Sequence, residues 1–194
     1  MQFKNIVLLL TSAIFIFACS STKPPAVEDS AGARMDLMQK GFLLSLPEGE
    51  GWKVVKKSNY KVLLSKSGAR GRDGYTIQVL VVSLPAFETN EEFLAFIEKR
   101  MEKSQENSNV IEHDASLYSA GNEMCVQYKS KENRTAKSGT DLTLETVSIT
   151  CHHPDNPDAG VYMALSKSYI PESSDEDMTA KATELFNNLY FTEL

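Results

Sequence analysis

The stretch from Tyr75 to Leu84 constrains the fold more than any other part of the sequence. It is rich in isoleucine, valine and leucine, so both faces of a strand formed by it would be largely apolar. Strands of this kind are typical of an internal position in a sheet, where both faces are covered. We therefore expect this strand in the middle of a sheet, with other elements packed on each side.

A helix is predicted soon after this strand. Thr89 and Glu92 form a T-x-x-E capping box, in which the two side chains bind backbone N–H groups that the first helical turn leaves free. Apolar side chains then recur at three- and four-residue spacing, at Phe93, Phe96, Ile97 and Met101. This pattern predicts an amphipathic helix that covers one face of the sheet.

The rest of the chain predicts further strands and one more helix. Short apolar runs indicate strands at residues 42–46, 60–64, 110–113, 117–118, 124–128, 142–151 and 161–165. A second capping box, Ser173 with Glu176, predicts a C-terminal helix with Met178, Ala182, Leu185 and Leu189 on one stripe. Tyr190 and Phe191 follow as a short apolar segment that could return to the sheet.

These elements predict an α+β domain, because strands in antiparallel runs are interrupted by one helix and closed by another. We expect one antiparallel β-sheet flanked by two main amphipathic helices, in a single domain from residue 35 to residue 194. The chain length of 194 residues suits one such domain.

The N-terminal region predicts export. Lys4 precedes an apolar run from Ile6 to Phe17. A run of about a dozen residues suits a secretory signal peptide, whereas a helix that spans a bilayer needs about 20. We expect residues 1–18 to be the signal peptide, with cleavage between Ala18 and Cys19.

Residues 19–34 differ in composition from the rest of the chain. They are mostly serine, proline, alanine, glycine and charged residues, and Val27 is the one sizeable apolar side chain before Arg34. A segment with so little to bury is predicted to be a flexible tether. The net charge of −6 also argues against a nucleic-acid partner, because phosphate binding relies on clustered lysine and arginine.

The four residues Ile16, Phe17, Ala18 and Cys19 resemble the lipobox of bacterial lipoproteins. The resemblance implies that Cys19 becomes the first residue of the mature chain and carries acyl groups such as palmitate. The lipid bilayer would then be a partner through Cys19. Ser20, in place of aspartate, resembles the default signal for outer-membrane delivery, so we expect a cell-envelope protein on the outer membrane that faces the periplasm.

Gly41–Pro47 leads to Gly51 and Trp52, and the predicted mid-chain helix, a long hairpin and a C-terminal helix ending in Leu189–Phe191 follow. In this set of features the domain resembles the PsbP-like family. That family includes DcrB-type bacterial lipoproteins and has an antiparallel sheet flanked by helices. The resemblance implies a role as a binding or assembly factor, because the members of that family have no catalytic site in common.

Cys125 and Cys151 remain after Cys19 is assigned. In an exported protein two cysteines normally form a disulfide, which would here contribute about 3 to 3.5 kcal/mol. However, if Ser130 and Leu142 flank the hairpin loop, Cys125 lies opposite about Val147, and Cys151 is about 13 Å further along. A disulfide needs Cα atoms within about 7 Å, so a bulge would have to shift the register. A disulfide and two separate thiols both stay open.

Residues 151–158 form the one cluster with metal-ligand chemistry, made of Cys151, His152, His153, Asp155 and Asp158. Its spacing is poor, because adjacent histidines on an extended backbone point to opposite sides. We therefore predict surface turn residues here, with no metal and no cofactor. The alternative is a metal-dependent hydrolase that uses the Cys151–Asp158 region.

No G-x-S-x-G nucleophile motif is present in the sequence. The favoured function is therefore a non-catalytic, membrane-tethered module that binds an envelope protein or a small ligand.

Overall fold

The computed structural model describes residues 34–68, 73–106, 108–120, 123–136, 138–171 and 177–194. The predicted signal peptide and Cys19 lie outside these residues, as does the predicted tether up to residue 33. The described residues all belong to one compact unit, Gly32–Leu194. Among them, no helix combines the length and the apolar character needed to cross a bilayer.

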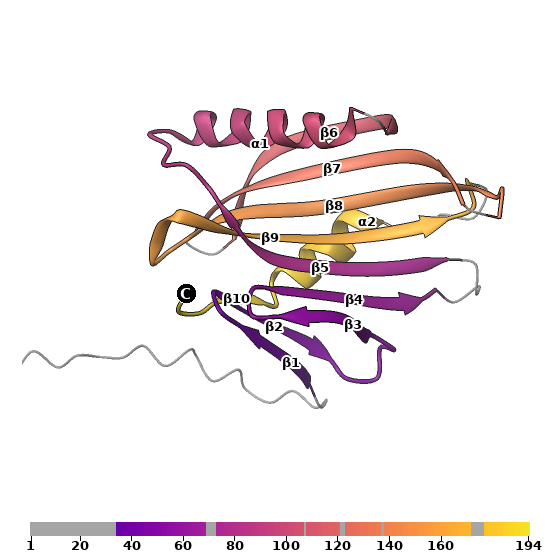
Figure 1. Cartoon of the computed structure of the whole chain (residues 1–194), viewed down its shortest axis with the longest axis horizontal. Coiled ribbons are helices and arrows are strands. Elements are labelled where there is room, and N and C mark those ends of the chain that lie inside the picture. The colour runs from indigo at the N-terminus through magenta and orange to yellow at the C-terminus, as the bar shows by residue number, and fades with distance from the viewer. Residues whose placement is uncertain (1–33, 69–72, 107, 121–122, 137, 172–176) are drawn as a thin grey trace, which may run out of the picture. The chain divides into compact units, whose positions relative to one another are not determined.

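In the described part of the chain, seven strands form a large antiparallel sheet (Figure 1). They are β3 (Lys53–Ser58), β4 (Lys61–Ser67), β5 (Gly74–Ser83), β6 (Asn109–Ala120), β7 (Glu123–Thr135), β8 (Asp141–His153) and β9 (Asn156–Tyr169). Their order is β3-β4-β5-β9-β8-β7-β6. The predicted internal position of the Tyr75–Leu84 strand is confirmed, because β5 lies between β4 and β9. The middle position belongs to β9 instead.

A second, three-stranded sheet contains β1 (Arg34–Gln39), β2 (Phe42–Pro47) and β10 (Leu189–Phe191), in the order β1-β2-β10. Tyr190 and Phe191 do return to a sheet, where they pair with Leu43 and Phe42 of β2. The small sheet packs on the large one, since Phe42 and Leu44 are fully buried in the same apolar cluster as strands β4, β5, β8 and β9.

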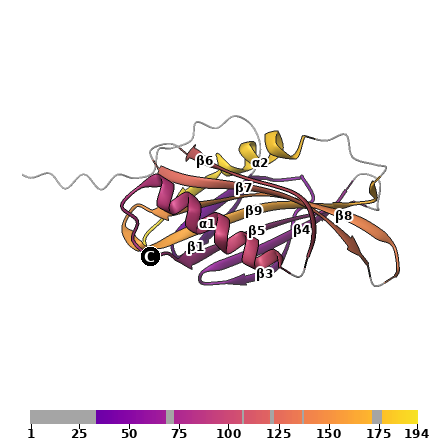
Figure 2. The same cartoon turned by 90° about the horizontal axis from the view of Figure 1, so that it is seen from above.

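Two helices, α1 (Asn90–Gln105) and α2 (Met178–Phe186), lie on opposite faces of the large sheet (Figure 2). Helix α2 shares one apolar cluster with the small sheet, and α1 forms another around Phe93 and Ile97. The predicted α1 cap is confirmed, because the Glu92 N–H donates to the Thr89 hydroxyl at 3.2 Å. The Glu92 carboxylate accepts from the Glu88 N–H at 2.9 Å.

The predicted fold class, α+β with one antiparallel sheet flanked by two main helices, is wrong. Strands hold 61% of the described residues and helices 17%, and the strands form two sheets. The prediction restricted strands to apolar runs, whereas polar segments such as Lys53–Ser58 extend the sheet through backbone hydrogen bonds. The second sheet arises because β2 pairs with both termini of the described unit rather than with β3.

The predicted start of the second helix is also wrong. The helix begins at Met178, and its N-cap is Asp177, whose carboxylate accepts from the Thr179 and Ala180 N–H groups at 2.9 and 3.1 Å. Ser173 and Glu176 lie outside the described residues. Leu189, predicted on the helical stripe, belongs to β10, because the helix ends at Phe186.

The large sheet ends in β3 on one side and β6 on the other. Each of these edge strands has an irregular register next to an exposed apolar side chain, Val55 in β3 and Ile111 in β6. Strand β3 is exposed along its whole length and also carries three lysines. Bulges and lysines are features that discourage edge-to-edge pairing between chains.

Candidate functional site

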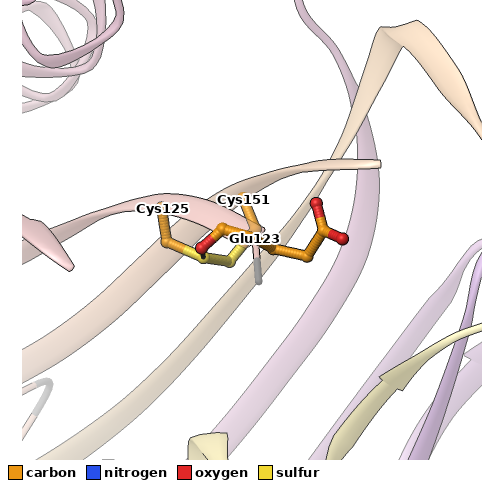
Figure 3. The surroundings of a disulfide bond; sticks show 3 residues. All are labelled: Glu123, Cys125 and Cys151. Carbon is orange, nitrogen blue, oxygen red and sulfur yellow. Dashed lines mark hydrogen bonds between the residues drawn. A yellow bond between two sulfur atoms is a disulfide. The ribbon is translucent and has the colours of Figure 1, made fainter. Parts of the chain in front are cut away.

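Cys125 of β7 and Cys151 of β8 form a disulfide (Figure 3). The two residues are directly opposite in the β7–β8 register, and their Cα atoms are 4.0 Å apart. Both side chains are buried in the cluster between the sheets. The bond therefore links two neighbouring strands within the core rather than at the surface.

The predicted register of this hairpin, with Cys125 opposite about Val147, is wrong. Strand β7 continues to Thr135 and β8 begins at Asp141, so Ser130 pairs with Thr146 rather than flanking the loop. The segment Lys131–Thr135 is polar and was predicted as loop. Each residue of this segment pairs with a residue of β8, so the segment is part of strand β7. The longer hairpin places Cys125 directly opposite Cys151.

The two adjacent histidines point to opposite faces of the sheet. The His152 ring lies on the α1 side, with its centroid 4.5 Å from that of Phe93. His153 is buried on the other side, where its Nε2 is 2.9 Å from the Thr192 carbonyl oxygen. The Asp155 N–H donates to His153 Nδ1, so Nε2 carries the proton and donates to Thr192. His153 thus fastens the β8–β9 turn to the C-terminal segment.

The geometry does not bring the Cys151–Asp158 residues together as a metal centre. Cys151 is used by the disulfide, and the histidines diverge. Asp155 is exposed in the turn between β8 and β9, and Asp158 is exposed near the start of β9. Within the described ranges, no three His, Cys, Asp or Glu side chains are grouped so that they could hold a metal ion. The hydrolase alternative therefore has no assembled ligand set in this region.

Burial lowers the pKa of His152 below its ordinary value of 6.5, and the charge of Glu123 offsets this in part. Since the folded pKa lies below the unfolded one, the unfolded chain binds the proton more readily. We expect the contribution of His152 to the free energy of unfolding to be greatest above pH 6.5 and to fall as the pH drops through the range just below it. Chemical denaturation at a series of pH values measures this slope. His152→Gln should flatten it, whereas His113→Gln, at an exposed site, is the matched control.

A groove lies between α1 and the large sheet, with a volume of about 260 Å³. Its floor comes from three strands and consists of Gln78, Leu80 and Val82 of β5, Thr150 of β8 and Tyr162 of β9. The helix side of the groove is formed by Ile97, Arg100 and Met101 of α1. Figure 2 shows α1 crossing over part of this face of the sheet. The groove thus opens where the helix leaves the strands uncovered.

The groove combines an apolar body with a few polar groups. Tyr162 is hydrogen-bonded to the Ser148 side chain, and burial raises the pKa of its hydroxyl, which therefore stays protonated at neutral pH. Among the described lining residues, Arg100 is the one with a charged side chain. An apolar hollow with a few convergent polar groups is the usual form of a small-ligand site.

Sequence reasoning did not find this groove. Its residues come from α1, β5, β8 and β9, and no short motif connects them. One sequence feature did hint at the groove. Gln78 is a polar residue among the apolar side chains on the face of β5 that is directed toward α1.

A second polar cluster lies near the small sheet. The Lys66 ammonium is 4.5 Å from the centroid of the Trp52 ring and 3.2 Å from the Glu50 carboxylate. The Trp52 indole N–H also donates to Glu50, at 3.1 Å. These three side chains interact with one another at the open end of the β3–β4 hairpin, where β3 begins and β4 ends.

Comparisons with known proteins give one kind of match. No family model and no curated protein matches this chain. Among solved structures, the chain is similar to the solution structure of cyanobacterial PsbP (CyanoP) from Synechocystis sp. PCC 6803, with 10% sequence identity and a TM-score of 0.46. The similarity covers 86% of this chain and 96% of that chain.

Proposed function

We propose that this chain is a bacterial lipoprotein of the cell envelope, anchored by acyl groups on Cys19, with a non-catalytic module that binds an envelope protein or a small ligand. The signal-peptide pattern and the Ile16–Cys19 lipobox support the anchor. Two or more acyl chains give stable membrane attachment, whereas one is marginal. The proposed DcrB-type, PsbP-like relationship rests on the sequence features described above.

The observation that carries this proposal is the buried Cys125–Cys151 disulfide. Disulfides form and persist in oxidising compartments such as the periplasm and are rare in the cytosol. A disulfide in the core is therefore the expected companion of an export signal. Ser20, directly after Cys19, supports the outer membrane, with the domain facing the periplasm.

The proposal that the module is non-catalytic is supported by the positions of the candidate metal ligands, which lie apart from one another in the structure. The described residues at 151–158 are divided between a disulfide, two opposite sheet faces and an exposed turn. The groove beneath α1 offers a surface for binding, and its described lining carries no His, Cys, Asp or Glu side chain.

Intact-mass measurement of the protein purified from membranes tests the anchor. We expect a mature chain that begins at Cys19 and carries the added mass of fatty acyl groups. The variant Cys19→Ser should lack this mass and lose its resistance to extraction by alkaline carbonate, whereas Ser21→Ala should behave like the wild type. An unmodified Cys19 thiol, or a retained leader, would contradict the proposal.

Replacement of Ser20 by aspartate tests the membrane assignment in a Gram-negative host. We expect the wild-type protein in the outer-membrane fraction of a sucrose gradient and Ser20→Asp in the inner-membrane fraction. The variant Ser20→Ala controls for loss of the serine itself. An inner-membrane position of the wild-type protein would overturn the outer-membrane assignment and leave the anchor intact.

A further inference from the structure

We propose that the groove between α1 and strands β5, β8 and β9 binds a small amphipathic carboxylate, such as a medium-chain fatty acid, with the carboxylate on Arg100. The inference rests on the proposed function, because it names the ligand class of a module proposed to bind. It is carried by the groove's charge, its length and its volume.

The charge of the groove is opposite to that of the protein. The whole chain has a net charge of −6, yet the charged side chain on the described lining of the groove is a cation, Arg100. A guanidinium matches the geometry of a carboxylate and can donate two parallel hydrogen bonds to it. One Arg100 nitrogen, Nη1, donates a long hydrogen bond of 3.4 Å to the Ser83 carbonyl oxygen, and the guanidinium has further N–H groups.

The position of Arg100 fixes the direction of the ligand. Because its guanidinium reaches Ser83, it stands at the Val82 end of the groove floor. From Val82 the floor continues along β5 past Leu80 to Gln78, which lies about 13 Å away at ~3.3 Å per residue. Ile97 and Met101 of α1 line the same groove. A tail that starts at Arg100 therefore runs along apolar side chains.

The volume sets the size of the ligand. At about 260 Å³ the groove is smaller than the roughly 300 to 1,000 Å³ usual for drug-sized ligands. It holds about nine groups of the size of a water molecule, at ~30 Å³ each. An eight-carbon acid such as octanoate suits both the length and the volume. Its carboxylate would meet Arg100, and its tail would extend toward Gln78.

Titration with octanoate tests the inference. The full chain is placed in lipid nanodiscs, binding is followed by calorimetry, and empty nanodiscs give the blank for partitioning into lipid. We expect saturable binding at one site per chain. The variant Arg100→Gln should weaken octanoate binding about tenfold or more, because a charge-assisted hydrogen bond is lost. Arg100→Lys should retain part of the affinity.

Two controls separate a binding role of Arg100 from a structural one. Lys99→Gln removes an exposed cation next to Arg100 that does not line the groove, so octanoate affinity should not change. The uncharged 1-octanol should bind wild type and Arg100→Gln equally. Leu80→Trp, which fills the groove, should abolish the binding of both ligands, with near-ultraviolet circular dichroism as the check on its fold.

The failure of this inference is distinguishable from failure of the proposed anchor. Octanoate titration of Cys19→Ser, in the same nanodisc preparation or in buffer if it is released, should match the wild type. An absence of saturable binding, or equal binding by Arg100→Gln and wild type, overturns the ligand assignment whatever the state of Cys19. An unmodified Cys19 with normal octanoate binding overturns the anchor alone.

Discussion

Replacement of both Cys125 and Cys151 by alanine should lower the free energy of unfolding by about 3.5 kcal/mol. The two cysteines are 26 residues apart in sequence, and a cross-link over that distance restricts the unfolded chain strongly. Both side chains lie in the main apolar cluster, so the variant also loses some packing there. Urea denaturation under oxidising conditions measures the difference.

Reduction provides the matched control for this variant. In a strong reductant, wild type and the double variant should unfold at similar urea concentrations, since neither then holds the cross-link. Equal stability of the two proteins under oxidising conditions, together with two titratable thiols in the unfolded wild type, would show that the cysteines are separate.

Replacement of Phe93 by alanine should cost about 3 to 5 kcal/mol, because a fully buried aromatic side chain is removed and a cavity remains. Phe93 attaches α1 to the sheet. Its ring centroid lies 5.1 Å from that of Phe87 and 4.5 Å from that of His152. Thermal or chemical unfolding of the purified variant measures the loss.

Phe96→Ala is the matched control for this prediction. Phe96 is on the same helix and contacts Phe87 at 5.2 Å between ring centroids, but it is only partly buried. Its replacement should cost about 1 to 1.5 kcal/mol. Losses of the same size at Phe93 and Phe96 would mean that α1 is not anchored through the buried ring.

The sequence predicted best those elements whose signal is local. The capping residue Thr89 and the apolar stripe at Phe93 and Ile97 are close enough in sequence to define α1 on their own. The internal position of β5 followed from its two apolar faces. Each of these features depends on residues within one element, so no knowledge of distant partners was needed.

Elements that depend on distant partners were mispredicted. Strand β3, Lys53–Ser58, is exposed throughout and is a strand because β4 pairs with it. The length of the β7–β8 hairpin, and hence the row that Cys125 occupies, depends on pairing of the polar segment Lys131–Thr135. The separation into two sheets depends on Phe42 pairing with Phe191, far along the chain.

The candidate site was out of reach for the same reason. The groove exists because one turn of α1, with Ile97 and Arg100, crosses strands whose order in the sheet is not their order in the sequence. The residue types that line the groove are common, and the groove can be recognised only from their proximity in the folded structure. The histidine doublet, in contrast, was conspicuous in the sequence, and the backbone directs its two rings to opposite sides.

The irregular register of the edge strands β3 and β6 affects how neighbouring copies of the chain interact at high density. If the chain is held on a membrane as proposed, neighbouring copies diffuse in two dimensions and collide often with their sheets in similar orientations. The displaced residues at Val55 and Ile111 break the regular spacing of backbone donors and acceptors that a neighbour would need to match. High surface density would then favour a fluid layer of separate molecules over fibres.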